Sequence, residues 1–210
     1  MKTVFLDLDG TLTDPKEGIT AAVNYALAQM GHATMHPDEM GWVIGPPLVD
    51  TFTQMGVSDP LRALDHYRDL YTRDGLFQNR LYDGILPALN QMRQAGNRLV
   101  LMTAKPHAYA RKITAHFGIT PYMAAEYGPE LDGTRGNKWD LLAHAMAELS
   151  CDPAQAVMVG DRAHDFKAAA LNNMASVGVH WGYGNADELA QATHQCARVP
   201  ELPGLIEQVL

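Results

Sequence analysis

The amino-acid sequence predicts an α/β fold: a doubly wound parallel sheet, Rossmann-like in its alternation of strand and helix, with an inserted helical module. Four short apolar runs have the nearly continuous pattern of strands buried on both faces of a parallel sheet. They are residues 3–8, 98–102, 156–159 and 175–179. Helical segments lie between them, and such alternation is typical of right-handed crossovers in a doubly wound sheet.

The helices of the predicted core are recognised by their apolar spacing and by the glycines that follow two of them. They are expected over residues 83–95, 107–117 and 138–149, with Gly96 and Gly118 directly after the first two. A glycine at such a place is a common end to a helix. Together with the strands, these helices predict a core formed by residues 1–14 and 80–210.

Residues 15–79 interrupt the alternation and predict the inserted module, for which we expect four helices. Asp14-Pro15-Lys16-Glu17 has the features of a helix start, with Asp14 as the cap and Pro15 as the first helical residue. Ser58-Asp59-Pro60 opens a second helix, and its expected inward side chains are Leu61, Leu64, Tyr67 and Tyr71. Ile44-Gly45-Pro46-Pro47 is predicted to be a turn, because proline restricts the residue before it and donates no N–H.

Composition limits the classes of partner. The 210 residues include 16 Lys and Arg against 24 Asp and Glu, a formal net charge of −8, and 47% are hydrophobic. The chain can therefore bury a core, and we expect no nucleic-acid partner, since such binding depends on Lys and Arg at phosphates. No signal peptide and no apolar run of about 18 residues is recognised, so a cytoplasmic monomer or homodimer is expected. Cys151 and Cys196 are expected to be buried or half-buried thiols.

Two carboxylates follow the first predicted strand, in Asp7-Leu8-Asp9-Gly10-Thr11. The carboxyl ends of parallel strands are where α/β sheets bind ligands, and an aspartate in a buried run needs a metal or hydrogen-bond partners. A calcium loop does not fit, because Leu12 and Gly18 occupy the positions that require glycine and glutamate.

Four further candidate residues follow later strands or begin helices. Thr103 ends the second strand before a helix, where a hydroxyl and backbone N–H groups can hold an anion. Lys138 begins a helix, an unfavourable place for a cation unless an anion is bound beside it. Asp161 and Asp165 follow a later strand, and oxygen ligands at this density suit Mg²⁺. His164, between them, is interpreted as an exposed loop histidine.

The order of these motifs resembles that of the haloacid dehalogenase superfamily of aspartate-nucleophile phosphatases. The matching segments are Asp7-Leu-Asp9-Gly-Thr11, Thr103, Lys138 and Gly160-Asp161 through Asp165. The helical insert stands where that family has its helical cap. Thr103-Ala104-Lys105-Pro106, the Ile44–Pro47 turn, Leu131–Arg135 and Gly182-Tyr183-Gly184 are most similar to the phosphoglycolate-phosphatase-like branch, although Trp139 replaces the more usual proline.

This resemblance implies a Mg²⁺-dependent phosphatase. Asp7 is expected to attack phosphorus and form an aspartyl phosphate, and Asp9 to act as acid and then base. The metal is expected on Asp7, the backbone carbonyl of Asp9 and Asp161, with Asp165 fixing Asp161. Thr103 and Lys138 are expected to hold the phosphoryl oxygens.

The substrate is expected to be a small phosphorylated metabolite. The residues that would contact it are Gly45, Thr11, Thr103, Ala104, Lys105 and Lys138. Phosphoglycolate is the first expectation, and a 5'-nucleotidase or pyrophosphatase on the same scaffold is the alternative. A phosphosugar mutase is less expected. Absence of G-x-G-x-x-G after the first strand disfavours nicotinamide binding.

Overall fold

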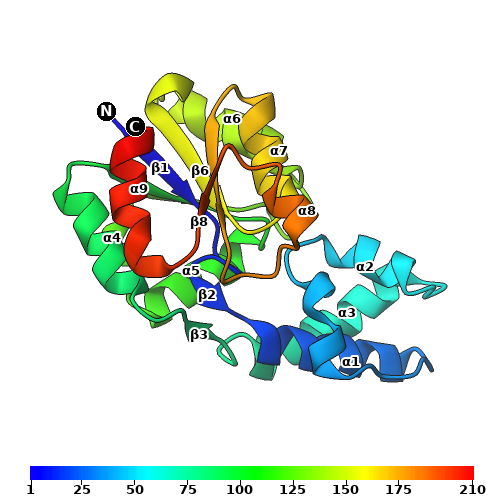
Figure 1. Cartoon of the computed structure of the whole chain (residues 1–210). Coiled ribbons are helices and arrows are strands. Elements are labelled where there is room, and N and C mark those ends of the chain that lie inside the picture. Colours follow the sequence, from blue (N-terminus) through cyan, green and yellow to red (C-terminus); the bar gives the residue numbers. More distant parts are fainter. The chain divides into compact units, whose positions relative to one another are not determined.

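The computed structural model describes residues 1–210 and divides them into two compact units (Figure 1). Unit 1 comprises residues 1–13 and 81–210, and unit 2 comprises residues 14–80. The chain therefore enters unit 2 directly after the first acid motif and returns from it before the second core strand. The two units are described in turn.

Unit 1 contains a six-stranded sheet whose strand order is β5-β4-β1-β6-β7-β8. All five strand pairs are parallel, which confirms the predicted doubly wound sheet. The strands are β1 (Thr3–Leu6), β4 (Arg98–Met102), β5 (Ala125–Tyr127), β6 (Ala156–Gly160), β7 (Ala175–Val179) and β8 (His194–Cys196). Strand β1 is central, so both of its neighbours can bring side chains to the residues that follow it.

Helices cover both faces of this sheet (Figure 1). They are α4 (Ile85–Gln94), α5 (His107–His116), α6 (Lys138–Glu148), α7 (Ala163–Leu171), α8 (Ala186–Leu189) and α9 (Leu202–Val209). Apolar side chains of α6 and α7, among them Leu141, Leu142 and Ala168, pack with Phe5 and Met158 of the sheet in one buried cluster. Burial of this kind contributes about 25 cal/mol per Å² of apolar surface. This packing fixes the two helices against one face of the sheet.

Unit 2 contains three α-helices rather than the expected four. They are α1 (Lys16–Gln29), α2 (Leu48–Gln54) and α3 (Pro60–Leu70), joined by the 3₁₀ turns η1 (Pro37–Glu39) and η2 (Gly41–Val43) and followed by the π-helical turn η3 (Tyr71–Gly75). Asp59 caps α3 by accepting the Arg62 N–H, as the sequence indicated. Helix α1 begins one residue later than predicted, at Lys16, whose N–H donates to Asp14 Oδ1 at 3.1 Å.

The predicted inward face of α3 is wrong at its first position. Leu61 is 65% exposed, whereas Ala63, Tyr67 and Tyr71 are buried. These three residues are spaced by four, so they lie along one face of the helix. Tyr67 and Tyr71 stack with their ring centroids 5.1 Å apart. The buried face is therefore rotated away from Leu61.

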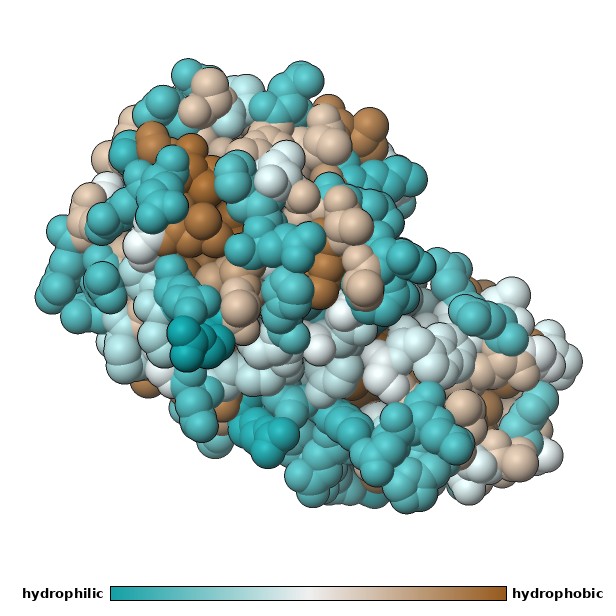
Figure 2. All heavy atoms as spheres, viewed as in Figure 1, coloured by the Kyte–Doolittle hydropathy of each residue, from teal (hydrophilic) through white to brown (hydrophobic).

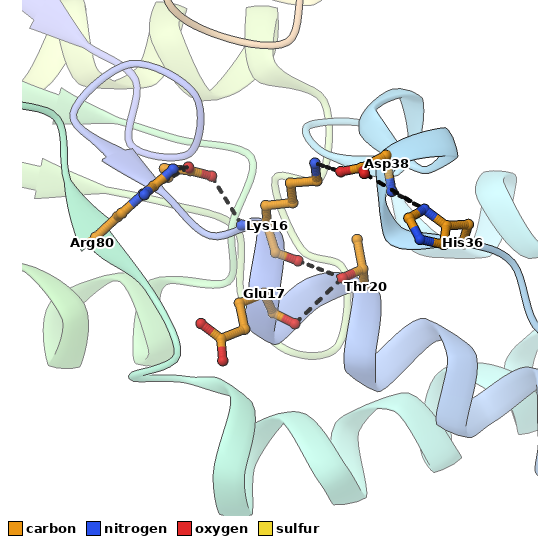
Figure 3. Close-up of polar contacts among 7 residues, drawn as sticks. Lys16, Glu17, Thr20, His36, Asp38 and Arg80 are labelled. Atoms are coloured by element: carbon orange, nitrogen blue, oxygen red, sulfur yellow. Dashed lines mark hydrogen bonds and ion pairs between the residues drawn. The ribbon is translucent and has the colours of Figure 1, made fainter.

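The two connections of unit 2 are held together by a short sheet and by the ion pair of Arg80 with Asp14, and Lys16 pairs with Asp38 of η1 nearby (Figure 3). Strands β2 (Thr13–Asp14) and β3 (Arg80–Leu81) pair. The Arg80 guanidinium donates to Asp14 Oδ2 at 2.7 and 3.0 Å, and Lys16 Nζ lies 2.6 Å from Asp38 Oδ1. A cavity of about 460 Å³ is lined by Asp14, Lys16 and Arg80 and also by Glu17.

Five large apolar side chains are exposed. They are Met1, Leu131 and Leu171 in unit 1 and Leu61 and Phe77 in unit 2. Figure 2 shows a mainly hydrophilic face with apolar areas between. None of the helices combines the length and the apolar character needed to cross a lipid bilayer. Cys151 is half-buried and Cys196 is buried, and both are free thiols, as expected.

Candidate active site

Three neighbouring strands bring the predicted acid and hydroxyl side chains to one edge of the sheet. Asp7 follows β1, Thr103 follows β4 and Asp161 follows β6, and the strand order places β1 between the other two. All three side chains are buried. Parallel strands end at a common edge, which is where open α/β sheets bind ligands.

Lys138, the first residue of α6, pairs with two of the predicted carboxylates. Its Nζ lies 2.8 Å from Asp7 Oδ1 and also contacts Asp165 Oδ1. Burial raises the pKa of Asp7 to about 6, although Lys138 acts in the opposite direction. Burial would lower the pKa of Lys138, but Asp165 and Asp7 together raise it above its usual value. The lysine is therefore a fixed positive charge beside Asp7.

Asp161 is fully buried and is held by two hydrogen bonds from other segments. Tyr183 N–H donates to its Oδ2 at 2.7 Å, and the Thr11 hydroxyl donates to its Oδ1 at 3.4 Å. Burial and the nearby charges of Asp165 and Asp7 raise the pKa of Asp161 well above its usual value. The carboxylate thus lies in a place where negative charge is costly without a cation.

Glycines bring the surrounding backbone against Asp161. A Cβ at Gly10, Gly182 or Gly184 would overlap atoms of Asp161, and Gly10 has a φ of +84° that side chains rarely adopt. The close approach explains why these positions require glycine. Trp181 adds a hydrogen bond from its Nε1 to the Thr11 carbonyl, at 3.0 Å. The loop that follows β7 is therefore packed directly on the first acid motif.

Asp9 pairs with a lysine that follows the second strand. Lys105 Nζ lies 2.5 Å from Asp9 Oδ2, and both side chains are nearly buried. The Lys105 N–H donates to the Thr103 hydroxyl at 3.2 Å. Asp9 Oδ1 is buried and has no hydrogen-bond partner. One oxygen of Asp9 is therefore occupied by an ammonium group, while the other remains available.

His164 is not the exposed loop residue that the sequence suggested. It lies in the first turn of α7 and is half-buried, with Nε2 3.7 Å from Asp165 Oδ1. Burial lowers its pKa to about 4, so the imidazole is neutral near pH 7. Ligand atoms of Asp7, His164 and Asp165 lie within 4.8 Å of one another. A neutral histidine is thereby added to the predicted acids.

The donor set fits a divalent cation. Three buried carboxylates, those of Asp7, Asp161 and Asp165, influence one another electrostatically, and Lys138 is the cation paired with two of them. Asp7 Oδ1 and Asp165 Oδ1 have no hydrogen bond of good geometry. A hard cation with oxygen ligands would supply the missing positive charge.

In unit 1, Lys138 contacts Asp7 and Asp165 directly, and Thr11 contacts Asp161. Asp161 is close enough to Asp7 and Asp165 for their charges to shift its pKa. Asp9, Thr103 and Lys105 form the adjoining group, and Ala104 lies between two of its members. Gly45 lies in the η2–α2 connection of unit 2, with a φ of +107°. Sequence reasoning assigned no site role to Tyr183, although the flanking glycines were recognised.

Comparison with known families gives one family model, described as haloacid dehalogenase-like hydrolase, that matches residues 4–179. A 5'-nucleotidase of Pseudomonas aeruginosa PAO1 is 40% identical to the chain over 209 residues, which are 97% of this chain and 95% of that protein. Tyrosine-protein kinase PtkA of Mycobacterium tuberculosis H37Rv is 43% identical over 185 residues, which are 88% of this chain and 64% of the kinase.

Among solved structures, the crystal structure of a predicted phosphatase from Clostridium acetobutylicum superposes with a TM-score of 0.94. It is 35% identical in sequence, and the match covers 99% of this chain and 98% of that one. The match includes residues of both units, because it leaves few residues of either chain unmatched. The fold of this chain thus occurs, over nearly its whole length, in a protein described as a predicted phosphatase.

Proposed function

The chain belongs to the haloacid dehalogenase-like hydrolase family and is a phosphatase, and we propose that it hydrolyses a small-molecule phosphate monoester through an aspartyl phosphate at Asp7. The observation that supports this most directly is the pairing of Asp7 with Lys138 at the end of the central strand. A carboxylate that attacks an anionic phosphoryl group needs such a charge beside it.

In the first step, an oxygen of Asp7 forms a bond to phosphorus while the bond from phosphorus to the leaving oxygen breaks. Asp9 gives that oxygen a proton, so an alcohol departs and the phosphoryl group remains on Asp7. In the second step Asp9 takes a proton from water, the water oxygen bonds to phosphorus, and the Asp7–phosphorus bond breaks. Asp9 Oδ1 suits this exchange because it is buried and unpartnered, whereas Oδ2 contacts Lys105.

The phosphoryl oxygens would be held by Thr103 and Lys138. Thr103 presents its hydroxyl at the turn between β4 and α5, and Lys138 lies at the amino end of α6. Backbone N–H groups at the start of a helix add to such a site. The same lysine would offset the negative charge of Asp7 as the two anions approach.

We assign the metal site to Asp7, the backbone carbonyl of Asp9 and Asp161, with Asp165 as their neighbour. When bound there, Mg²⁺ would neutralise charge on the transferring group. Asp165 would act through other groups, because its Oδ2 accepts the Arg162 N–H at 3.0 Å and its Oδ1 contacts Lys138. Burial makes the ionisation of Asp7 and Asp161 costly, and nearby carboxylates add to this cost, so a divalent cation beside them would offset the negative charge.

The substrate class is proposed from the sequence motifs and from the relatives. Phosphoglycolate is suggested by the motifs of the branch that the chain resembles. A nucleoside monophosphate is the second candidate, because the Pseudomonas relative that matches nearly the whole chain is described as a 5'-nucleotidase. We further propose that residues 15–79 form the cap that selects between such substrates; in the structure, residues 14–80 are a compact unit.

A substrate screen tests this proposal. Purified protein with Mg²⁺ is assayed for phosphate release from phosphoglycolate, nucleoside monophosphates, sugar phosphates and pyrophosphate. Asp7→Asn, purified in parallel, controls for contaminating phosphatases. Release from one of the monoesters, absent in the variant, would support the proposal. A second assay, with ATP and a tyrosine peptide, addresses the activity in the name of the kinase relative. Peptide phosphorylation without monoester hydrolysis would contradict the proposal.

A further inference from the structure

Glu188 links the loop after β7 to the turn that carries the second acid motif. It lies in the short helix α8, and its side chain is 18% exposed. Its Oε1 accepts the Arg162 Nε–H at 3.0 Å and the Ala163 N–H at 3.2 Å. Arg162 and Ala163 are the two residues after Asp161. One glutamate oxygen therefore fixes both the side chain and the backbone of that turn.

The other oxygen of Glu188 has a local role. Oε2 accepts the Asn185 N–H at 3.2 Å, and the Asn185 side chain accepts the Glu188 N–H at 2.9 Å. This reciprocal pair is a capping box for α8. Capping accounts for Oε2, but it does not require the contacts of Oε1, which reach residues more than 20 positions away in the sequence.

The segment that precedes Glu188 contacts Asp161 itself. Tyr183 N–H donates to Asp161 Oδ2 at 2.7 Å. Gly182 and Gly184 pack so closely on Asp161 that neither position has room for a Cβ. Asp161 is thus held on one side by residues 182–184 and followed on the other by the turn that Glu188 fixes. A shift of this loop relative to the turn would change the orientation of the Asp161 carboxylate.

We propose that Glu188 is a positioning residue for the metal site: through Arg162, Ala163 and the 182–184 loop it holds Asp161 in the orientation that binds a divalent cation. The inference rests on the proposed function, because it assumes that Asp161 is a metal ligand. Groups that orient metal ligands in this way typically change metal affinity by about 10–100-fold when they are removed.

The test compares Glu188→Ala and Glu188→Asp with the wild type. Aspartate keeps the charge but is shorter by one methylene, so it cannot serve Arg162, Ala163 and Asn185 together. Glu201→Ala is the matched control, because Glu201 pairs with Arg198 on the surface of the same unit. Binding of Mn²⁺ to the substrate-free protein is titrated by electron paramagnetic resonance. Mg²⁺ activation and the KM for substrate are measured in parallel, and thermal unfolding in EDTA verifies the fold.

The inference predicts a rise of about 10–100-fold in the Mn²⁺ dissociation constant for Glu188→Ala. For Glu188→Asp it predicts a rise of about threefold or more, and for Glu201→Ala no change. The Mg²⁺ activation constant should rise in parallel while the KM for substrate stays constant. If Glu188→Ala does not fold, the Mn²⁺ dissociation constant of Glu188→Asp tests the inference instead.

Two outcomes would overturn the inference, and they can be distinguished. Wild-type Mn²⁺ affinity in the folded Glu188→Ala variant, or in Glu188→Asp if the alanine variant does not fold, would overturn it alone. The metal-dependent phosphatase proposal would stand in that case. If the wild type binds no Mn²⁺ and needs no Mg²⁺, both the role of Glu188 and the metal-dependent mechanism are wrong.

Discussion

Asp7 is the side chain on which the proposed chemistry depends, because it lies at the end of the central strand and contacts Lys138. Asp7→Asn has nearly the same size but is a far weaker nucleophile. We expect hydrolysis of a generic aryl phosphate to fall by at least about 10³-fold. The protein should still unfold cooperatively on heating. Asp83→Asn, at an exposed position of the same unit, is the control and should retain full activity; equal rates for the two variants would exclude Asp7 as nucleophile.

The same substitution should also change the free energy of unfolding in a pH-dependent way, measured with EDTA present so that no metal is bound. The folded-state pKa of Asp7 is about 6, against 3.8 in the unfolded chain. Its contribution is therefore fully present below pH 4 and is lost as pH rises through 6. Asparagine does not titrate. As pH rises through this range, the free energy of unfolding of Asp7→Asn should therefore increase relative to that of the wild type by roughly 3 kcal/mol.

Chemical denaturation at pH 4 and at pH 7 measures this change for both proteins. A difference between variant and wild type that is the same at the two pH values would show that Asp7 titrates normally in the folded protein. His164 changes stability in the opposite direction, because its pKa is lowered to about 4. Both proteins contain His164, so its effect cancels when the variant is compared with the wild type at each pH. The comparison therefore isolates the effect of Asp7, which the wild type alone would not do.

The sequence alone identified the aspartates of the site but not all of the side chains that contact them. Asp7, Asp161 and Asp165 stood out because carboxylates follow strands that are otherwise apolar. The contact between Asp9 and Lys105 could not be predicted, since it depends on how two loops approach each other across the sheet edge. For the same reason, the neutral, half-buried state of His164 follows from its place on α7 rather than from the residues beside it in the sequence.

The loop after β7 gives a prediction at the scale of elements. A Cβ at Gly184 would overlap the Asp161 backbone carbonyl, whereas a Cβ at Gly204, in α9, meets nothing within 4 Å. Gly184→Ala should therefore lower stability by about 2 kcal/mol or more. Gly204→Ala should raise it by about 0.5–1 kcal/mol, because alanine favours the helix. Urea denaturation measures both, and a neutral Gly184→Ala would show that the loop can move away from Asp161.

The core strands were predictable because burial on both faces gives nearly continuous apolar runs. Strands β4 and β7 have the predicted bounds, and β1 ends two residues earlier than expected. The edge strands β5, with sequence AEY, and β8, with sequence HQC, were missed. They are three residues long, and Cys196 is the one buried residue among them, so they carry no continuous apolar pattern. In unit 2 the 3₁₀ and π-helical turns do not have the periodicity of an α-helix, which explains the overestimate of its helices.

For the whole molecule, metal binding should appear as a gain in stability, because a cation that binds only the folded state stabilises it. We expect Mg²⁺ to raise the thermal midpoint of the wild type and EDTA to reverse the rise and abolish activity. Asp161→Ala removes a proposed ligand itself, so it should lose most of this rise and raise the Mg²⁺ requirement by at least the roughly 100-fold upper value expected for groups that only orient a ligand. Asp83→Ala serves as the control. Full activity after exhaustive removal of divalent ions would contradict the proposed mechanism.

The most direct test of the central claim is chemical trapping of the aspartyl phosphate. Borohydride reduces an acyl phosphate to an alcohol, which would convert residue 7 to homoserine, and peptide mass spectrometry would locate the change. We predict homoserine at position 7 when the enzyme is quenched during turnover of a cleaved monoester with Mg²⁺, and none without substrate. Modification at a different aspartate, or none at all during rapid turnover, would contradict nucleophilic catalysis by Asp7.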